Sequence, residues 1–323
     1  RKVGHMNTVY IDDTLLVGAS KEECEANTMA TMGLLRETGF TLHPVKSVFT
    51  PVQIIQYIGF MIDSRSMTVS LPAEKMEKIR ACCRALLQLE RPTIRQVAEV
   101  VGQLVAAGPA VELGKLYYRV MDNDKSKALQ RTGGNFDATM TLSPLAQEDL
   151  KWWIANLPAM RKSFCPTPTA LVIHSDASDE GWGGAIIGQG QKTGGQWSET
   201  ESKMHINEKE LYAALLSLQS LAPHLSRCKI NFQLDNTTAV AYVNNQGGRK
   251  IGCNGIARRM WLWATQRGIT LIATYLPGML NVVADQQSRI LHDISFHLNS
   301  ILFHMWSGTD TLSMHCIHKP CVR

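Results

Sequence analysis

An ordered series of strand-like and helix-like segments across residues 170–290 constrains the fold more than any other feature of the chain. Three strand-like runs come first, over residues 170–175, over the glycine-rich stretch 181–187 and near 196–198. Helix-like and strand-like segments then alternate, over 207–221, 229–234, from about 237, around 261–263, over 269–276 and after Pro277. Three strands followed by alternating helices and strands predict a mixed sheet with helices on its faces.

Four carboxylates occupy the ends of these predicted strands and the starts of these predicted helices. Asp176 and Asp235 end strand-like runs. Glu210 lies in the first turn of a helix, and Asp285 begins the last one. Strand ends and helix starts of α/β sheets converge on one crevice, where four negative charges repel one another unless cations lie between them. The alternative is four unrelated acidic residues at element ends, where Asp is a common cap.

Carboxylate clusters of this kind have a specific chemistry. Hard oxygen ligands select Mg²⁺ or Mn²⁺. Two such ions can stabilise both the attacking and the leaving oxygen of phosphodiester cleavage. If the four side chains meet, the sequence therefore predicts a two-metal site for phosphodiester chemistry.

Two hairpins are predicted in the first 70 residues. Short apolar runs flank Asp12 and Asp13, which predicts a hairpin over residues 7–18 with both aspartates at its tip. Residues 52–70 predict a second hairpin, with a polar turn at residues 63–66.

Helices with a surplus of positive charge are predicted in the middle of the chain. Ser70 and Pro72 begin one helix that runs to about Leu89, and a second begins at Pro92. Residues 71–131 hold 11 Lys and Arg against 7 Asp and Glu, which is most of the net charge of +5. Such a surplus permits a polyanionic partner without requiring one, and a solvated helix face is the alternative.

A polar segment and a boundary between domains are expected next. Residues 122–140 are polar and contain two adjacent glycines, so we expect a loop or linker there. Trp152 and Trp153 follow on a short predicted helix, where core or interdomain packing is favoured over stacking on bases. Prolines then mark a domain boundary, at positions 158, 166 and 168.

Composition excludes several protein classes. Hydrophobic residues make up 45% of the 323 residues and charged residues 19%, which indicates a globular chain rather than a disordered one. The eight cysteines are scattered without a CxxC pair, which favours reduced thiols and an intracellular compartment. The His and Cys residues between 315 and 321 do not match a recognised zinc spacing. No apolar run reaches membrane-spanning length, so no membrane association is expected.

Four segments in the second half resemble, in order, the motifs of type 1 ribonuclease H domains of retroelements. They are HSDAS at 174–178, HINEKEL at 205–211, LDNTTA at 234–239 and NVVADQQSR at 281–289. One short motif is weak evidence, whereas four in order are strong. The resemblance implies a ribonuclease H-like α/β fold whose metal-binding catalytic residues are Asp176, Glu210, Asp235 and Asp285.

Glu208 is a near competitor of Glu210 for the glutamate position of this motif. Glu210 is preferred because the family pattern places its glutamate directly before Leu and an Ala-rich helix, as in residues 210–214. Many of these domains also carry a histidine in the loop before the last aspartate. This chain has none between Tyr275 and Asp285, which puts a role for histidine in doubt.

The resemblance also implies an RNA·DNA hybrid as partner, and it suggests which side chains contact it. Ribose 2′-hydroxyls are read across a shallow minor groove, where Asn207 and Asn236 are candidates to bind them, unless they serve only as helix caps. Arg249 and Lys250, with Arg258 and Arg259 further along, are candidates to bind phosphates; the alternative is a solvated surface.

The first half resembles the polymerase part of reverse transcriptases. YIDD at 10–13 resembles their YxDD motif, GFTLHPVKS at 39–47 the motif that follows, and YIGF at 57–60 the primer-grip hairpin. The basic helices 72–121 look like a thumb. By this resemblance Asp12 and Asp13 would bind the two polymerase Mg²⁺ ions, Lys46 would approach the incoming phosphates, and a template–primer duplex would be the partner.

The two resemblances predict an α/β and α+β fold in five parts. These are a partial palm (1–70), a helical thumb (71–131), a connection (132–169), a ribonuclease H domain (170–290) and a C-terminal tail (291–323). The chain begins at Arg1 without Met and looks like a piece of a longer protein. The fingers and the first palm carboxylate would lie upstream of it, so we do not expect the chain as given to polymerise.

The leading hypothesis is therefore a fragment of a retroelement reverse transcriptase with an intact ribonuclease H domain. That domain would cleave the RNA strand of RNA·DNA hybrids with two Mg²⁺ or Mn²⁺ ions, leaving a 3′-hydroxyl and a 5′-phosphate. The segments 205–207, 247–248 and 296–310 look most like DIRS-type retrotransposons, with Ty3-like elements as second choice. The alternative is a non-catalytic nucleic-acid-binding remnant. An intracellular location, cytoplasmic or nuclear, is expected, and the sequence leaves the oligomeric state open.

Overall fold

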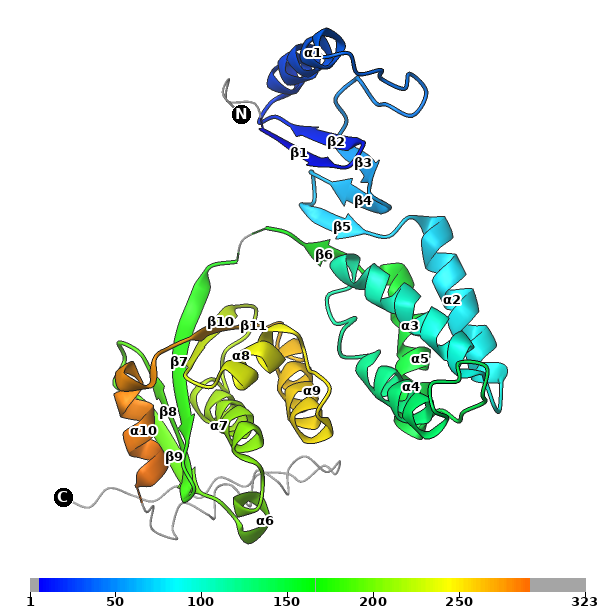
Figure 1. The fold of residues 1–323 in the computed structure, drawn as a ribbon. Coiled ribbons are helices and arrows are strands. Elements are labelled where there is room, and N and C mark those ends of the chain that lie inside the picture. Colours follow the sequence, from blue (N-terminus) through cyan, green and yellow to red (C-terminus); the bar gives the residue numbers. More distant parts are fainter. Residues whose placement is uncertain (1–5, 166, 291–323) are drawn as a thin grey trace, which may run out of the picture. The chain divides into compact units, whose positions relative to one another are not determined.

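A computed structural model describes residues 6–165 and 167–290, and this part of the chain divides into two compact units between Thr167 and Pro168 (Figure 1). The division falls among the prolines that predicted a domain boundary. The tail 291–323, with its His and Cys residues, lies outside the described residues. Among the described helices, none combines the length and the apolar character needed to cross a bilayer.

The first unit begins with the predicted hairpin. Strands β1 (Met6–Tyr10) and β2 (Asp13–Val17) pair antiparallel, with Tyr10 opposite Asp13. Ile11 adopts a left-handed φ of 55° at the turn. Helix α1 (Lys21–Glu37) follows, because the side chain of Ser20 caps its N-terminus by accepting a hydrogen bond from the Glu23 N–H. The hairpin and its aspartate tip are therefore confirmed.

The predicted hairpin with its polar turn at residues 63–66 is confirmed, but the segment before that turn is itself divided by a second turn. Ile58 and Gly59 both adopt left-handed φ angles, 47° and 71°, and form a tight turn that the apolar sequence hides. The result is an antiparallel sheet in the order β3 (Ile54–Tyr57), β4 (Phe60–Asp63), β5 (Thr68–Ser70) and β6 (Lys162–Ser163).

A cluster of helices completes the first unit. It contains α2 (Ala73–Gln88), α3 (Ile94–Ala107), α4 (Arg119–Arg131) and α5 (Pro144–Asn156), with short 3₁₀ turns at Gly108–Ala110 and Leu157–Ala159. Residues 122–140 were predicted to form a loop, but residues 122–131 belong to helix α4. Lys, Ala, Leu and Gln are good helix formers, and they form this helix although few of its residues are buried. The loop begins only after that, at Gly133 and Gly134, both with positive φ.

The paired tryptophans on α5 have structural roles. Trp153 is fully buried and donates a hydrogen bond from Nε1 to the Tyr117 carbonyl over 3.1 Å. Trp152 stacks on the Tyr117 ring, with the ring centroids 3.8 Å apart. The packing interpretation of this pair is confirmed.

The second unit is built on a five-stranded mixed sheet in the order β11-β10-β7-β8-β9. Its strands are β7 (Thr169–Ala177), β8 (Gly181–Ile186), β9 (Lys192–Gln196), β10 (Lys229–Leu234) and β11 (Thr270–Tyr275). β7, β8 and β9 pair antiparallel, whereas β10 runs parallel to both β7 and β11. The predicted mixed sheet, and with it the α/β and α+β fold class, is confirmed.

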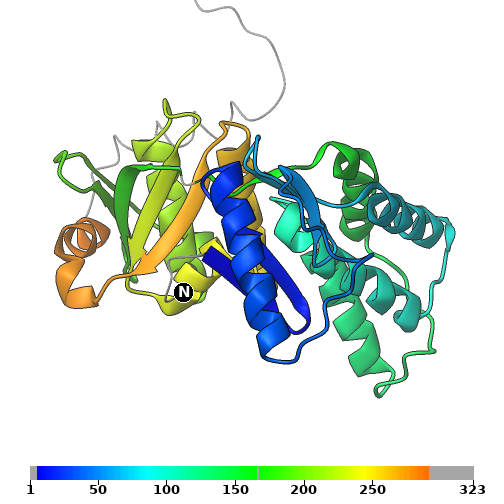
Figure 2. The same cartoon turned by 90° about the horizontal axis from the view of Figure 1, so that it is seen from above.

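Helices cover both faces of this sheet (Figures 1 and 2). They are α6 (Glu199–Ser202), α7 (Ile206–Leu221), α8 (Thr237–Asn244), α9 (Ile251–Thr265) and α10 (Val282–Arg289), the last preceded by a 3₁₀ turn at Gly278–Leu280. α7 packs against β7 and β8 and also contacts α8 and α9. α10 packs against the same strands from the other face.

The glycines of β8 explain how closely the helices approach. Consecutive residues of a strand point to opposite faces, so Gly183 and Gly184 face different helices. A Cβ at Gly183 would lie 2.3 Å from the carbonyl oxygen of Ala284 in α10. A Cβ at Gly184 would lie 2.2 Å from Oγ of Ser217 in α7. The glycine-rich strand therefore lets α7 and α10 pack directly on the backbone of the sheet.

Candidate active site

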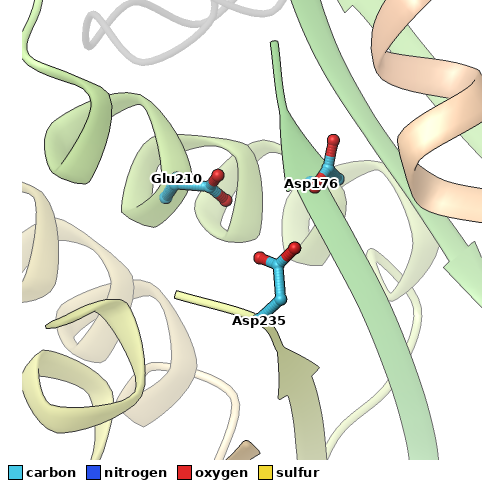
Figure 3. A group of neighbouring side chains, drawn as sticks. All are labelled: Asp176, Glu210 and Asp235. Carbon is cyan, nitrogen blue, oxygen red and sulfur yellow. The ribbon is translucent and has the colours of Figure 1, made fainter. Parts of the chain in front are cut away.

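Three of the predicted carboxylates meet at one edge of the second unit's sheet. Asp176 lies near the end of β7, Asp235 directly follows β10, and Glu210 projects from the first half of α7. One carboxylate oxygen from each residue lies within 4.8 Å of the other two. Figure 3 shows the three carboxylates turned toward one another. β7 and β10 are parallel neighbours, so their carboxyl ends reach the same edge.

Burial and mutual repulsion disfavour the ionised forms of these groups. Burial, together with the charges of Asp176 and Asp235, raises the pKa of Glu210 to about 9. Burial also raises the pKa of Asp176 to about 6 and, with the charge of Asp285, raises the pKa of Asp235. An all-oxygen donor set that cannot easily carry its own negative charge fits hard divalent cations.

Asp285 stands beside this group of three rather than inside it. Its Oδ1 accepts hydrogen bonds from the Arg289 side chain at 2.7 and 3.0 Å, one turn further along α10. Its charge nevertheless contributes to the raised pKa values of Asp176 and Asp235. The carboxylate is 42% exposed, which places it at the rim of the cluster.

The structure separates Glu208 from Glu210. Glu208 is not a member of the carboxylate cluster, although it lies on the same helix. A Cβ added to Gly252 would lie only 1.7 Å from the Oε1 of Glu208. Glu208 therefore faces the first turn of α9. The choice of Glu210, made from the sequence pattern, agrees with this arrangement.

Asn207 and Asn236 are brought together next to Asp235. The Nδ2 of Asn236 donates a hydrogen bond to Oδ1 of Asn207 over 3.0 Å. The Oδ1 of Asn236 accepts the N–H of Ala239 over 2.9 Å and so caps α8. The cap alternative therefore holds for Asn236, which also directly follows Asp235 in the chain.

The basic residues are placed around α9. Arg249 and Lys250 are exposed at its N-terminal end, where the Lys250 N–H donates to the Tyr242 hydroxyl over 2.8 Å. The guanidinium of Arg259 lies 5.0 Å from the centroid of the Tyr212 ring, a cation–π contact. Arg249 and Lys250 therefore keep charged ends available to solvent, whereas Arg259 is engaged with an aromatic ring.

Two further residues, Asn281 and Ser288, form hydrogen bonds to Asp176. Ser288 donates from Oγ to Asp176 Oδ2 over 2.9 Å, and Asn281 donates from Nδ2 to Asp176 Oδ1 over 3.4 Å. The sequence spacing could have indicated both residues, because Asn281 lies four residues before Asp285 and Ser288 lies three residues after it. This spacing puts all three on one helix face.

The polymerase residues of the first unit are placed differently. Asp12 and Asp13 are exposed at the tip of the β1–β2 hairpin, where the Tyr57 hydroxyl donates to the Asp13 carbonyl over 3.4 Å. Within the described residues, no group of three metal-ligating side chains includes either aspartate. Lys46 is exposed, and no hydrogen bond or ion pair in the described part of the chain joins it to Asp12 or Asp13. Their polymerase roles stay a prediction.

The chain is similar to parts of curated viral polyproteins. It is 28% identical over 159 residues to the enzymatic polyprotein of carnation etched ring virus, a match that covers 46% of this chain and 23% of that protein. The enzymatic polyprotein of cauliflower mosaic virus (strain Strasbourg) is 30% identical over 138 residues, which cover 39% of this chain and 20% of that protein. The matches thus span about a fifth of the length of these relatives. No family model matches the chain.

Solved structures are similar to the chain at low identity. The foamy viral protease–reverse transcriptase in complex with an RNA/DNA hybrid has a TM-score of 0.42 and 14% identity, over 98% of this chain and 38% of that one. RNase H1 from the halophilic archaeon Halobacterium salinarum has a TM-score of 0.31 and 16% identity, over 36% of this chain and 92% of that one. A function for this chain therefore has to be argued from its own carboxylate cluster.

Proposed function

We propose that the second unit hydrolyses the RNA strand of RNA·DNA hybrids with divalent metal ions. The observation that carries this proposal is the cluster of Asp176, Glu210 and Asp235, whose oxygens lie within 4.8 Å of one another at a sheet edge. Buried carboxylates in such a cluster repel one another without cations. The order of the four sequence motifs supports the choice of nucleic acid hydrolysis over other metal chemistry.

Each residue of the site has a part in this proposal. Asp176, Glu210 and Asp235 would hold Mg²⁺ or Mn²⁺, two ions per site, with Asp285 completing the donor set at the rim. Bound ions supply an activated water and stabilise the leaving oxygen of the phosphodiester.

Side chains next to the cluster would recognise the hybrid. The amides of Asn207 and Asn236 offer both donors and acceptors to ribose hydroxyls, which distinguish RNA from DNA. Arg249 and Lys250 would bind backbone phosphates, which position the duplex without reading its sequence.

The proposal extends to the origin of the whole chain. The sequence resemblance, together with the similarity to viral enzymatic polyproteins, supports a fragment of a retroelement reverse transcriptase. In this proposal the first unit is the palm remnant and thumb, with Asp12 and Asp13 at its hairpin tip, and it binds a template–primer duplex. DIRS-type elements are the preferred source and Ty3-like elements the second.

A cleavage assay on the whole chain tests the proposal. A hybrid labelled on its RNA strand is incubated with wild type, Asp235→Asn and Glu210→Gln, with Mg²⁺, with Mn²⁺ and with EDTA. Metal-dependent cleavage by wild type and its loss in both variants are expected. Glu208→Gln is the matched control, because this glutamate lies on the same helix outside the cluster, and it should retain cleavage.

Two outcomes would count against hydrolysis. Equal, background-level cleavage by wild type and Asp235→Asn would contradict it. Tight binding of hybrid without cleavage would instead support a non-catalytic nucleic-acid-binding remnant.

A further inference from the structure

We propose that Asn281 and Ser288 of the α10 segment are positioning residues that orient Asp176 for metal binding, an inference that rests on the proposed function. Each donates a hydrogen bond to a different oxygen of the same carboxylate, Asn281 to Oδ1 and Ser288 to Oδ2. Donors on both oxygens fix the plane of the carboxylate as well as its position. Asn281 and Ser288, which do not bind the metal themselves, would thereby set the orientation of the Asp176 carboxylate.

The two donors are built into the core rather than lying on the surface. Asn281 is fully buried, and Ser288 is only 1% exposed. The Nδ2 of Asn281 also donates to the Ser175 carbonyl over 3.1 Å, so the two hydrogens of one amide bind two successive residues of β7. The Ser288 carbonyl accepts from Ser178 Oγ over 2.7 Å, which fastens the C-terminal end of α10 to the chain just beyond β7.

The Ser288 hydroxyl lies between two possible acceptors. This hydroxyl has one hydrogen and two acceptors within reach, Asp176 Oδ2 at 2.9 Å and the Asp285 carbonyl at 2.8 Å. A hydrogen bond to a carboxylate is stronger than one to a neutral carbonyl, which favours Asp176 as the acceptor. Each carboxylate oxygen has two acceptor sites, so Asp176 can accept these hydrogen bonds and still bind a cation together with Glu210 and Asp235.

These contacts also link Asp176 to Asp285. Asp285 lies between Asn281 and Ser288 on the same helix face, and its N–H donates to the Asn281 carbonyl over 3.0 Å. The hydrogen bonds that orient Asp176 therefore also set where α10 presents Asp285. Hydrogen-bond partners of metal ligands typically change metal affinity about 10- to 100-fold when they are lost.

Metal binding by the whole chain tests this role. Mg²⁺ and Mn²⁺ affinities are measured by calorimetry and by the metal-dependent rise in Tm, for wild type, Ser288→Ala and Asn281→Ala. We expect the apparent Kd for the metal to rise about 10-fold in each variant. The metal concentration for half-maximal cleavage should rise in parallel, with much of the rate restored at saturating metal.

Matched variants separate positioning from packing. Ser217→Ala removes another fully buried serine hydroxyl, from α7 on the opposite face of β8, and should leave the metal affinity unchanged. Ser288→Thr keeps the hydroxyl and should retain most of the affinity, whereas Ser288→Cys keeps the size, donates weakly and should lose it. This pair keeps the test decisive if Ser288→Ala does not fold.

The two proposals fail in different ways. Wild-type metal affinity in folded Ser288→Ala and Asn281→Ala, or equal losses in Ser217→Ala, would overturn the positioning role alone. A wild-type chain that binds neither Mg²⁺ nor Mn²⁺ would overturn the proposed function and this inference with it.

Discussion

The side chain of Asn236 caps helix α8 with its oxygen and binds Asn207 with its nitrogen, at 2.9 and 3.0 Å. The oxygen of this amide thus stabilises helix α8, and its nitrogen holds the side chain of Asn207. Asp235, a member of the carboxylate cluster, is the preceding residue. The two contributions of Asn236 can therefore be separated by substitution.

Asn236→Ala should lower the free energy of unfolding by about 1 kcal/mol, because α8 loses its cap. Asn236→Ser should restore most of this stability, since a serine hydroxyl also caps a helix. Both variants should bind hybrid more weakly than wild type, because neither presents the amide N–H to Asn207. Urea denaturation and hybrid-binding titrations measure the two effects. If Asn236→Ser bound hybrid as tightly as wild type, the amide would have no role in recognition.

Gly183→Ala should lower the free energy of unfolding by about 1–3 kcal/mol. The new Cβ would lie 2.3 Å from the Ala284 carbonyl oxygen and 2.5 Å from the Ser288 backbone nitrogen, and backbone atoms cannot rotate away as side chains do. Gly255→Ala is the matched control, because it lies in α9 with nothing within 4 Å of its Cβ position. It should stabilise the protein by about 0.5–1 kcal/mol. Equal stability of the two variants would contradict the close packing of α10 on β8.

The metal-free protein should become less stable as pH rises. The pKa of Glu210 is raised by burial from 4.5 to about 9 in the folded chain, and that of Asp176 from 3.8 to about 6. Between its unfolded and its folded pKa, each of these groups is protonated in the folded state but ionised in the unfolded state. For each such extra proton, the free energy of unfolding falls by up to about 1.4 kcal/mol per pH unit. Urea denaturation in EDTA at several pH values between 4 and 9 measures this slope.

Mg²⁺ should oppose that loss, because a cation binds the deprotonated carboxylates and its stabilising effect grows with pH. Glu210→Gln should flatten the pH dependence in EDTA, since an amide does not titrate. A metal-free stability that rose between pH 5 and pH 8 would contradict the burial of charge at this site.

We expect that residues 1–323 do not incorporate nucleotides. A polymerase centre needs carboxylates that hold two metal ions together, and among the described residues no third ligand joins Asp12 and Asp13. A primer-extension assay with a labelled primer, both RNA and DNA templates and Mg²⁺ or Mn²⁺ measures this directly. Incorporation that disappeared in Asp12→Asn, beside an unaffected Asp63→Asn control, would show that the hairpin tip is a working polymerase site.

Several local features followed from the sequence alone. Pro72 predicted the start of α2 and the apolar runs around Asp12 predicted the β1–β2 hairpin, because helix starts and hairpins depend on neighbouring residues. The helix at residues 119–131 was missed, because its polar composition resembles a loop when no apolar face is required to bury it. The turn at Ile58 and Gly59 was not placed from the local pattern, because a single glycine within an apolar run is a weak turn signal.

The candidate site divides in the same way. The sequence by itself determined which carboxylates to compare, because Asp176, Asp235 and Glu210 stand at the ends of regular, strongly patterned elements. Only the tertiary structure decided that these three meet while Asp285 stays at the rim with Arg289, and that Glu208 turns to α9. It also decided that Asn281 and Ser288 hold Asp176. The reason is physical: element types depend on local pattern, whereas distances between side chains depend on strand order and on how closely helices pack on a glycine-rich strand.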